Sequence, residues 1–157
     1  MNVLLNIAQT ALHHYAVRAC LLAGLSPMVG LLHECRSGHP ALASDLQEPF
    51  RHLMDRVVLE SLEWMRPKDF QPDMDGPYSL RLLPGAARRF TGSVARQLAW
   101  RCRVRGESES RPYRLHLVGL ARRLHGWFLH PEKGLEVFEH DDDNGSDDEP
   151  VRGGLRH

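Results

Sequence analysis

The sequence has no long hydrophobic segment and few cysteines, and these shortages exclude several classes of protein. Its longest apolar run, residues 19–25, falls far short of the ~20 residues that a membrane-spanning helix needs. The three cysteines form no C-x-x-C pair, which argues against a zinc ribbon or a disulfide scaffold. No basic start leads into an apolar block, so we expect no secretory signal, no membrane and a cytoplasmic location.

Net charge is also absent, because segments of opposite sign cancel. Residues 1–85 have a net charge of −2, residues 86–130 of +8, residues 131–149 of −8, and residues 150–157 of +2. All ten basic residues of the 86–130 segment are arginines, whose forked hydrogen bonds suit phosphate groups. This segment is either a solvated helix face or a nucleic-acid surface, for which Arg88, Arg89 and Arg96 are weak candidates.

Helical periodicity covers most of the chain and predicts an all-α helical bundle. Apolar residues recur at helical spacing over residues 2–23, 42–64, 85–104 and 113–129. Pro49 lies early in the second of these segments, where it kinks the helix or marks its true start. The prolines of residues 66–83 interrupt the pattern, and this segment is expected to form an irregular stretch or a short hairpin that pairs 69–71 with 78–82.

The chain divides into a helical domain and an acidic tail. Residues 1–139 contain all of the apolar periodicity. Residues 140–157 are acidic and glycine-rich with almost no apolar side chains, so we expect this tail to be disordered.

One group of residues has the chemistry of a metal site. Asp45 and Glu48 are three residues apart, which on a helix places both carboxylates on one face. The loop before them can fold His33 back over that helix. One imidazole with one or two carboxylates suits Mn²⁺ or Mg²⁺, ions that activate phosphodiesters. On spacing alone, the residues favour an ordinary solvated helix with Asp45 as a cap and a hydrogen-bonded His33 over a metal site.

Several sequence blocks carry a resemblance to a known family. In order, they read N-V-L-L-N at 2–6, A-G-L-S-P at 23–27, G-L-L-H-E at 30–34, G-H-P-A-L-A at 38–43, D-L-Q-E-P-F-R at 45–51 and D-R-V-V-L at 55–59. Their order and spacing resemble the CRISPR-associated spacer-acquisition integrase family, CRISPR-associated protein one. The match is clear over residues 2–90, fainter to residue 139 and absent from the tail.

The resemblance implies a function and a site. The family's C-terminal domain is a helical bundle with a divalent-metal site, whose ligands fall on His33 and Glu48 here, with Asp45 as a second acid. The family is a metal-dependent DNA endonuclease and integrase of CRISPR adaptation that works as a homodimer with the second CRISPR-associated protein. A DNA 3′-hydroxyl attacks a repeat phosphodiester of the CRISPR array, which joins the captured protospacer DNA to it. The arginines of 86–130 then fit a DNA-facing surface.

The sequence also departs from the family pattern. Family members carry an N-terminal β-rich domain and a further metal-binding Glu before the first matched helix, and neither is found in this sequence. His39 stands where the family has Arg. A three-ligand site that loses one ligand binds metal weakly. We therefore expect a truncated form of the enzyme with little or no activity on its own. The alternatives are a non-catalytic helical DNA-binding or assembly remnant, or a helical bundle without a DNA role.

Overall fold

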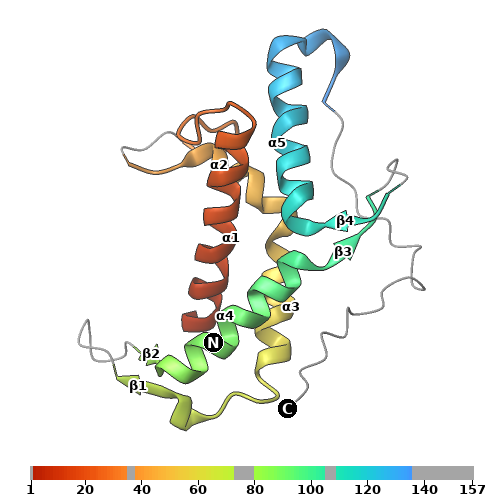
Figure 1. Cartoon of the computed structure of the whole chain (residues 1–157). Coiled ribbons are helices and arrows are strands. Elements are labelled where there is room, and N and C mark those ends of the chain that lie inside the picture. The colour runs from red at the N-terminus through yellow and green to blue at the C-terminus, as the bar shows by residue number, and fades with distance from the viewer. Residues whose placement is uncertain (1, 35–37, 73–79, 105–108, 136–157) are drawn as a thin grey trace.

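The computed structural model describes residues 2–34, 38–72, 80–104 and 109–135, and these residues form five α-helices and two short strand pairs. The helices are α1 (Asn2–Leu22), α2 (Ala41–Gln47), α3 (Arg51–Ser61), α4 (Pro84–Ala99) and α5 (Tyr113–Leu129). Helix α1 contacts each of the other four (Figure 1). The predicted all-α bundle with a short β hairpin is confirmed, whereas the predicted tail, 140–157, lies outside the described residues.

Helix α1 occupies the centre because one of its faces consists of small and medium apolar residues. The fully buried positions Leu4, Ala8, Leu12 and Ala16 recur every four residues, which places them on one stripe. Gly24, at φ +75°, ends the helical segment. Its left-handed conformation lets the Leu25 N–H donate to the Cys20 carbonyl at 2.9 Å. The expected first helix, 2–23, is therefore confirmed to within one residue.

The single helix expected over 42–64 is wrong, because the chain forms three shorter elements there, but the predicted break at Pro49 is confirmed. Helix α2 leads into the 3₁₀ turn η1 (Glu48–Phe50), from which α3 continues to Ser61. Pro49 causes this change, since it lacks the N–H of a regular α-helical bond and its ring crowds the preceding turn. The Glu48 N–H instead bonds the Asp45 carbonyl three residues back. The turn directs Phe50 into the core, where it is fully buried.

Two antiparallel strand pairs flank the helices. Strand β1 (Phe70–Pro72) pairs with β2 (Leu80–Leu82) in the register Phe70 opposite Leu82, close to the expected hairpin. Strand β3 (Arg101–Cys102) pairs with β4 (Arg111–Pro112), although residues 100–104 were expected to continue the third helix. Helix α4 ends at Ala99 instead. The fourth helix is confirmed at its predicted bounds, between Pro112 and Pro131.

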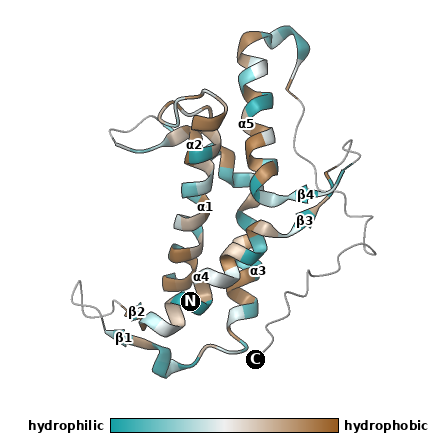
Figure 2. Ribbon diagram, in the orientation of Figure 1, coloured by the Kyte–Doolittle hydropathy of each residue, from teal (hydrophilic) through white to brown (hydrophobic). Residues whose placement is uncertain are grey.

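The bundle has two distinct ends. The loop after α1 and helix α2 lie at one end, whereas the β1–β2 hairpin lies at the other, beside the start of α1 (Figure 1). Hydrophobic and hydrophilic colours alternate along the helices, as expected for helices that bury one face (Figure 2). Within the described segments, no helix combines the length and apolar character needed to cross a membrane.

Candidate active site

The carboxylate of Asp45, in α2, holds the loop that precedes this helix. Asp45 Oδ2 accepts hydrogen bonds from the backbone N–H groups of Leu31, at 2.5 Å, and Leu32, at 3.0 Å. Asp45 Oδ1 accepts from the backbone N–H of His33 at 3.1 Å and lies 2.5 Å from His33 Nδ1. One side chain thus contacts three consecutive backbone donors and one imidazole. The loop adopts a defined conformation over α2 without pairing in any sheet.

Gly30 allows this loop to approach α2 so closely. A Cβ atom at position 30 would lie 2.7 Å from the His33 carbonyl oxygen, 2.8 Å from the Ala41 Cβ and 3.0 Å from Asp45 Oδ2. Real Cβ atoms are not found at the first two distances. The glycine of the G-L-L-H-E block is therefore required by packing against α2. It is a site residue that the sequence reasoning did not single out.

A second set of hydrogen bonds joins the loop to the first turn of α2. The N–H groups of Leu42 and Ala43 donate to the Pro27 carbonyl at 2.9 and 3.4 Å. The first N–H groups of a helix have no partner within it, so an outside carbonyl satisfies them here. The A-G-L-S-P block and the start of α2 are thereby fixed relative to each other, on both sides of the His33 loop.

The environment of Asp45 favours its ionised form. Burial acts to raise the pKa of the Asp45 carboxyl, and its side chain is only 7% exposed. The hydrogen bonds from the His33 side chain and from the backbone of Leu32, Leu31 and His33 outweigh burial, and they hold the pKa below its ordinary value. Asp45 is therefore a carboxylate at neutral pH. Its four lone-pair directions match the four donors that surround it.

This arrangement fixes the tautomer of His33. An ionised carboxylate can only accept hydrogen bonds, so the His33 Nδ1 atom beside Asp45 carries the proton. The Nε2 atom of the neutral ring then keeps its lone pair. The His33 side chain is 42% exposed. An accessible imidazole nitrogen with a fixed tautomer is the form in which histidine binds metal ions.

Glu48, the other predicted ligand, lies at the start of η1 and is 38% exposed. Its Oε1 atom accepts a hydrogen bond from Arg51 Nη1 at 2.9 Å. The structure thus brings His33 and Asp45 into contact. The Glu48 carboxylate contacts Arg51. Among the described residues, no group of three or more His, Cys, Asp and Glu side chains could hold a metal ion.

His39, at the position where the family has Arg, belongs to a second cluster that includes Ser44 of α2. His39 Nε2 lies 3.1 Å from Ser44 Oγ, and the Ser44 hydroxyl also reaches the Pro40 carbonyl at 3.3 Å. The His39 ring stacks on that of His13, with 6.3 Å between the ring centroids. Burial lowers the pKa of His13, which a hydrogen bond with Gln47 partly offsets. These contacts join α1 to α2 and to the residues just before it.

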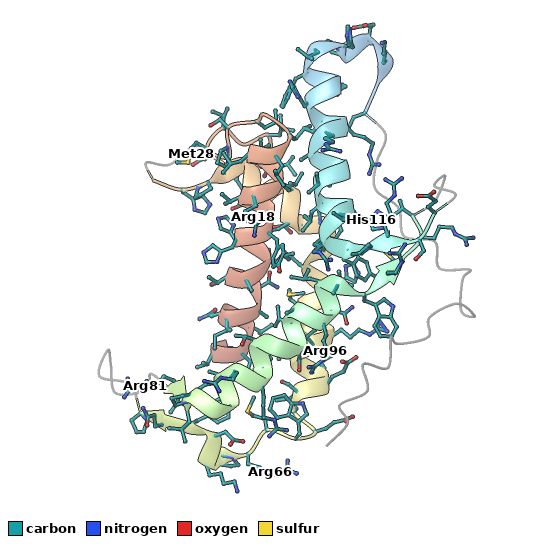
Figure 3. The ribbon with its side chains drawn as sticks, viewed as in Figure 1. Arg18, Met28, Arg66, Arg81, Arg96 and His116 are labelled. Carbon is teal, nitrogen blue, oxygen red and sulfur yellow. The ribbon has the colours of Figure 1, made fainter. Side chains whose placement is uncertain are left out.

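The three candidate arginines lie on the solvent face of α4. Arg89 and Arg96 are seven residues apart, or about 20° around the helix axis, and Arg88 lies about 100° from Arg89. The buried face of α4 lies on the other side and contains Ala86, Phe90, Val94 and Leu98. All three arginines are exposed, and Figure 3 shows Arg96 on this helix. They form one basic surface, as a DNA contact requires.

Two of these arginines have partners within the chain. The Arg89 guanidinium carbon lies 4.3 Å from the centre of the Trp64 ring. This contact links α4 to the residues after α3. Arg96 Nη2 donates to Ser93 Oγ at 2.8 Å. The contact with Trp64 directs Arg89 toward the residues after α3, whereas the bond to Ser93 holds Arg96 against its own helix.

Comparison with known proteins gives one consistent family. The profile of the family described as CRISPR associated protein Cas1 matches residues 1–96. The chain is 52% identical over 62 residues to the CRISPR-associated endonuclease Cas1 3 of Thermus thermophilus, which covers 39% of this chain and 19% of that protein. It is 44% identical over 73 residues to Cas1 2 of Rhodospirillum rubrum, covering 45% of this chain and 21% of that protein. The chain thus matches about a fifth of the length of these relatives.

Solved structures agree with this assignment. A casposase bound to an integration product superimposes with a TM-score of 0.77 and 28% identity, over 86% of this chain and 39% of the casposase chain. A Cas6-RT-Cas1–Cas2 complex gives a TM-score of 0.71 and 27% identity, over 83% of this chain and 14% of the matched chain. The family profile spans more than half of the chain and includes His33, Asp45, Glu48 and all three candidate arginines. The resemblance carried by the sequence blocks is confirmed, and the chain belongs to the CRISPR-associated protein Cas1 family.

Proposed function

We propose that this chain forms the helical, metal-binding part of a DNA endonuclease and integrase of CRISPR adaptation. In this proposal His33 and Glu48 bind Mg²⁺ or Mn²⁺, and the α4 arginines hold the DNA backbone. The observation that carries the proposal is the His33–Asp45 pair, in which a buried carboxylate fixes an exposed imidazole. The names of the relatives support the activity, since the proteins from Thermus thermophilus and Rhodospirillum rubrum are both called endonucleases.

The residues present fit a hard or borderline divalent ion. His33 offers one imidazole nitrogen and Glu48 offers one carboxylate, which are ligand types that Mn²⁺ and Mg²⁺ accept. A bound metal ion would supply Lewis-acid activation of a phosphodiester. Asp45 orients the His33 ring and holds its Nδ1 proton, whereas Glu48 would exchange its hydrogen bond with Arg51 for the metal. That Asp45 is itself a metal ligand stays a prediction. All four lone-pair directions of its carboxylate already face hydrogen-bond donors of the protein.

The proposed reaction joins DNA to DNA. A DNA 3′-hydroxyl attacks a phosphodiester of the CRISPR repeat, a new phosphodiester forms and the repeat strand leaves with its own 3′-hydroxyl. The guanidinium groups of Arg88, Arg89 and Arg96 would neutralise phosphates of the bound strands. The solved neighbours support these partners, because one is a casposase with an integration product and others are Cas1–Cas2 complexes. DNA, the second CRISPR-associated protein and a homodimer are therefore the proposed partners of the complete enzyme.

Direct measurement of Mn²⁺ binding tests the site without requiring catalysis. Isothermal titration of the 157-residue chain with Mn²⁺ should give one site, and His33→Ala and Glu48→Ala should each weaken binding at least tenfold. His14→Ala is the matched control, since His14 is exposed on α1 and has no role in the proposed site. Equal Mn²⁺ affinity of the wild type and His33→Ala would show that the ligand assignment is wrong. Failure of the wild type to bind millimolar Mn²⁺ would contradict the metal-dependent function of the isolated chain.

One observation favours a second function. Because the described residues hold no group of three metal-ligating side chains, the chain could bind DNA without catalysing any reaction. This non-catalytic DNA-binding or assembly function predicts DNA affinity that falls steeply with salt and is unchanged by EDTA. Fluorescence anisotropy with a labelled duplex, measured with and without EDTA, distinguishes the two functions. A loss of DNA joining by the complete enzyme after His33→Ala, with DNA affinity retained, would exclude the non-catalytic alternative.

A further inference from the structure

The two carboxylates of the candidate site differ in what holds them. Asp45 is held by the backbone of the loop over residues 31–33 and by the His33 ring. Glu48 is held by a side chain, since its Oε1 atom accepts a hydrogen bond from Arg51 Nη1 at 2.9 Å. The side chains of Glu48 and Arg51 are 38% and 50% exposed. An exposed ion pair is weak, so Glu48 is the carboxylate that can change its partner.

The backbone at Pro49 brings Glu48 and Arg51 together. The Arg51 N–H donates to the Glu48 carbonyl, and the Glu48 N–H donates to the Asp45 carbonyl, so both bonds span three residues. In such 3₁₀ geometry, side chains three residues apart lie directly above each other, whereas in a regular α-helix they are offset by about 60°. The E-P-F-R sequence therefore places a cation directly beside the proposed metal ligand.

The Arg51 guanidinium and a divalent ion compete for the same carboxylate. Glu48 gives up its bond with Arg51 when it turns to a metal ion, and the guanidinium then lies close to a second cation. Like charges repel at this range, so the guanidinium favours an anion over its earlier position. Arginine presents five N–H donors in a fork that matches a phosphate group. A DNA phosphate brought to the metal ion is an anion of this kind.

We propose that Arg51 exchanges partners, pairing with Glu48 in the metal-free protein and with a DNA phosphate once Glu48 binds the metal ion. This inference rests on the proposed function and assigns Arg51 as a positioning residue that acts through Glu48. It gives Arg51 two effects of opposite sign. Arg51 weakens metal binding in the absence of DNA, and it strengthens DNA binding in the presence of metal. A residue that only supported the fold would aid both.

Isothermal titration with Mn²⁺ tests the first effect on the 157-residue chain. Arg51→Gln should bind Mn²⁺ about two- to fivefold more tightly than the wild type, because the competing ion pair is lost. Arg51→Lys keeps the charge but not the fork, so its affinity should lie between the two. Arg56→Gln is the matched control. Arg56 pairs with Glu60 on α3 at 3.5 Å and lies about 140° around the helix axis from Arg51, so its loss should change Mn²⁺ affinity by less than about 1.5-fold.

Fluorescence anisotropy with a labelled duplex tests the second effect. DNA affinity is measured in EDTA and in saturating Mn²⁺, and the ratio of the two affinities is compared between variants, because Mn²⁺ also screens the phosphates directly. This ratio should be about threefold or more higher in the wild type than in Arg51→Gln. Arg56→Gln should give the ratio of the wild type. Circular dichroism should show that all variants keep the native helix content.

The outcomes separate this inference from the proposed function. If the wild type binds no Mn²⁺, both are overturned. If the wild type binds Mn²⁺ and His33→Ala weakens that binding, the proposed site stands. The exchange by Arg51 is then overturned alone if Arg51→Gln binds Mn²⁺ no more tightly than the wild type, or if Arg56→Gln tightens binding equally, because net charge would then be the cause. It is also overturned if Mn²⁺ changes the DNA affinity of the wild type and Arg51→Gln by the same factor.

Discussion

Replacing Asp45 with asparagine tests whether its carboxylate holds the His33 loop. The carboxylate accepts four hydrogen bonds, whereas asparagine can accept only through its carbonyl oxygen and would turn an NH₂ group toward N–H donors. Hydrogen bonds to a charged group contribute about 1.5–3 kcal/mol each. Because the loop residues are exposed, water replaces part of the hydrogen bonding that their N–H groups lose. We therefore expect Asp45→Asn to lower the free energy of unfolding by about 2–4 kcal/mol.

The effect of Asp45→Asn should depend on pH in a defined direction. The folded-state pKa of Asp45 lies below its ordinary value, so its contribution to stability is complete above the unfolded-state pKa of about 3.9. That contribution is lost as the pH falls below this value and through the lower folded-state pKa. Urea unfolding at pH 7 should therefore show the full difference between wild type and Asp45→Asn, and unfolding near pH 3 should show a smaller one.

Asp55→Asn is the matched control for this prediction. Asp55 is exposed on α3, and its substitution should change the free energy of unfolding by less than about 0.5 kcal/mol. The reasoning is refuted if Asp45→Asn and Asp55→Asn unfold at the same urea concentration at pH 7. It is equally refuted if the difference between wild type and Asp45→Asn does not shrink on acidification, because the charge of Asp45 would then not be what stabilises the loop.

Two further predictions concern the loop and the tail. Gly30→Ala should lower the free energy of unfolding by about 1–3 kcal/mol, since its Cβ would overlap the Ala41 Cβ and the His33 carbonyl. Gly85→Ala, in the first turn of α4 with open space around it, should be neutral or stabilising by up to about 1 kcal/mol in the same urea unfolding assay. Deletion of residues 140–157, which hold six acidic and two basic residues, should strengthen DNA binding at low salt, measured by anisotropy. Unchanged DNA affinity would show that the tail does not compete for the arginines.

Helices could be predicted from the sequence where local signals and packing agree. Helix α5 begins and ends at its predicted residues because Pro112 precedes it and Pro131 follows it closely. The second predicted helix was too long because a single proline, Pro49, changes the bonding of the next turn to 3₁₀ geometry. Periodicity alone cannot show this change, since the apolar residues on both sides of Pro49 continue to face the same core.

The β3–β4 pair was not predicted because its strands are only two residues long. Such strands carry no alternating pattern, and contacts from other parts of the chain fix them. The buried side chain of His116 in α5 places Nε2 3.0 Å from the Cys102 carbonyl oxygen. The N–H of Tyr113 donates to the Trp100 carbonyl at 3.0 Å. These contacts depend on how α5 packs, which no local sequence pattern encodes.

The sequence predicted that a loop folds His33 over the helix that contains Asp45, but not the geometry of their contact. Spacing placed Asp45 and Glu48 on one helix face, whereas the structure assigns Asp45 to α2 and Glu48 to the following 3₁₀ turn. The role of Asp45 as an acceptor for three backbone N–H groups depends on a loop twelve to fourteen residues earlier. Gly30 allows the close approach of that loop to α2, and it is the residue from which this approach could have been predicted.

The hydrogen bonds of Asp45 fix the proposed metal ligand together with the backbone that precedes it. A histidine is usually held in place by burial, but the His33 side chain is 42% exposed and is held by Asp45 instead. Because the N–H groups of Leu31 and Leu32 are directed to the same carboxylate, the backbone of this segment is fixed while the Leu32 side chain stays 81% exposed. Asp45→Asn should consequently weaken Mn²⁺ binding, because the His33 ring would no longer be held in one orientation.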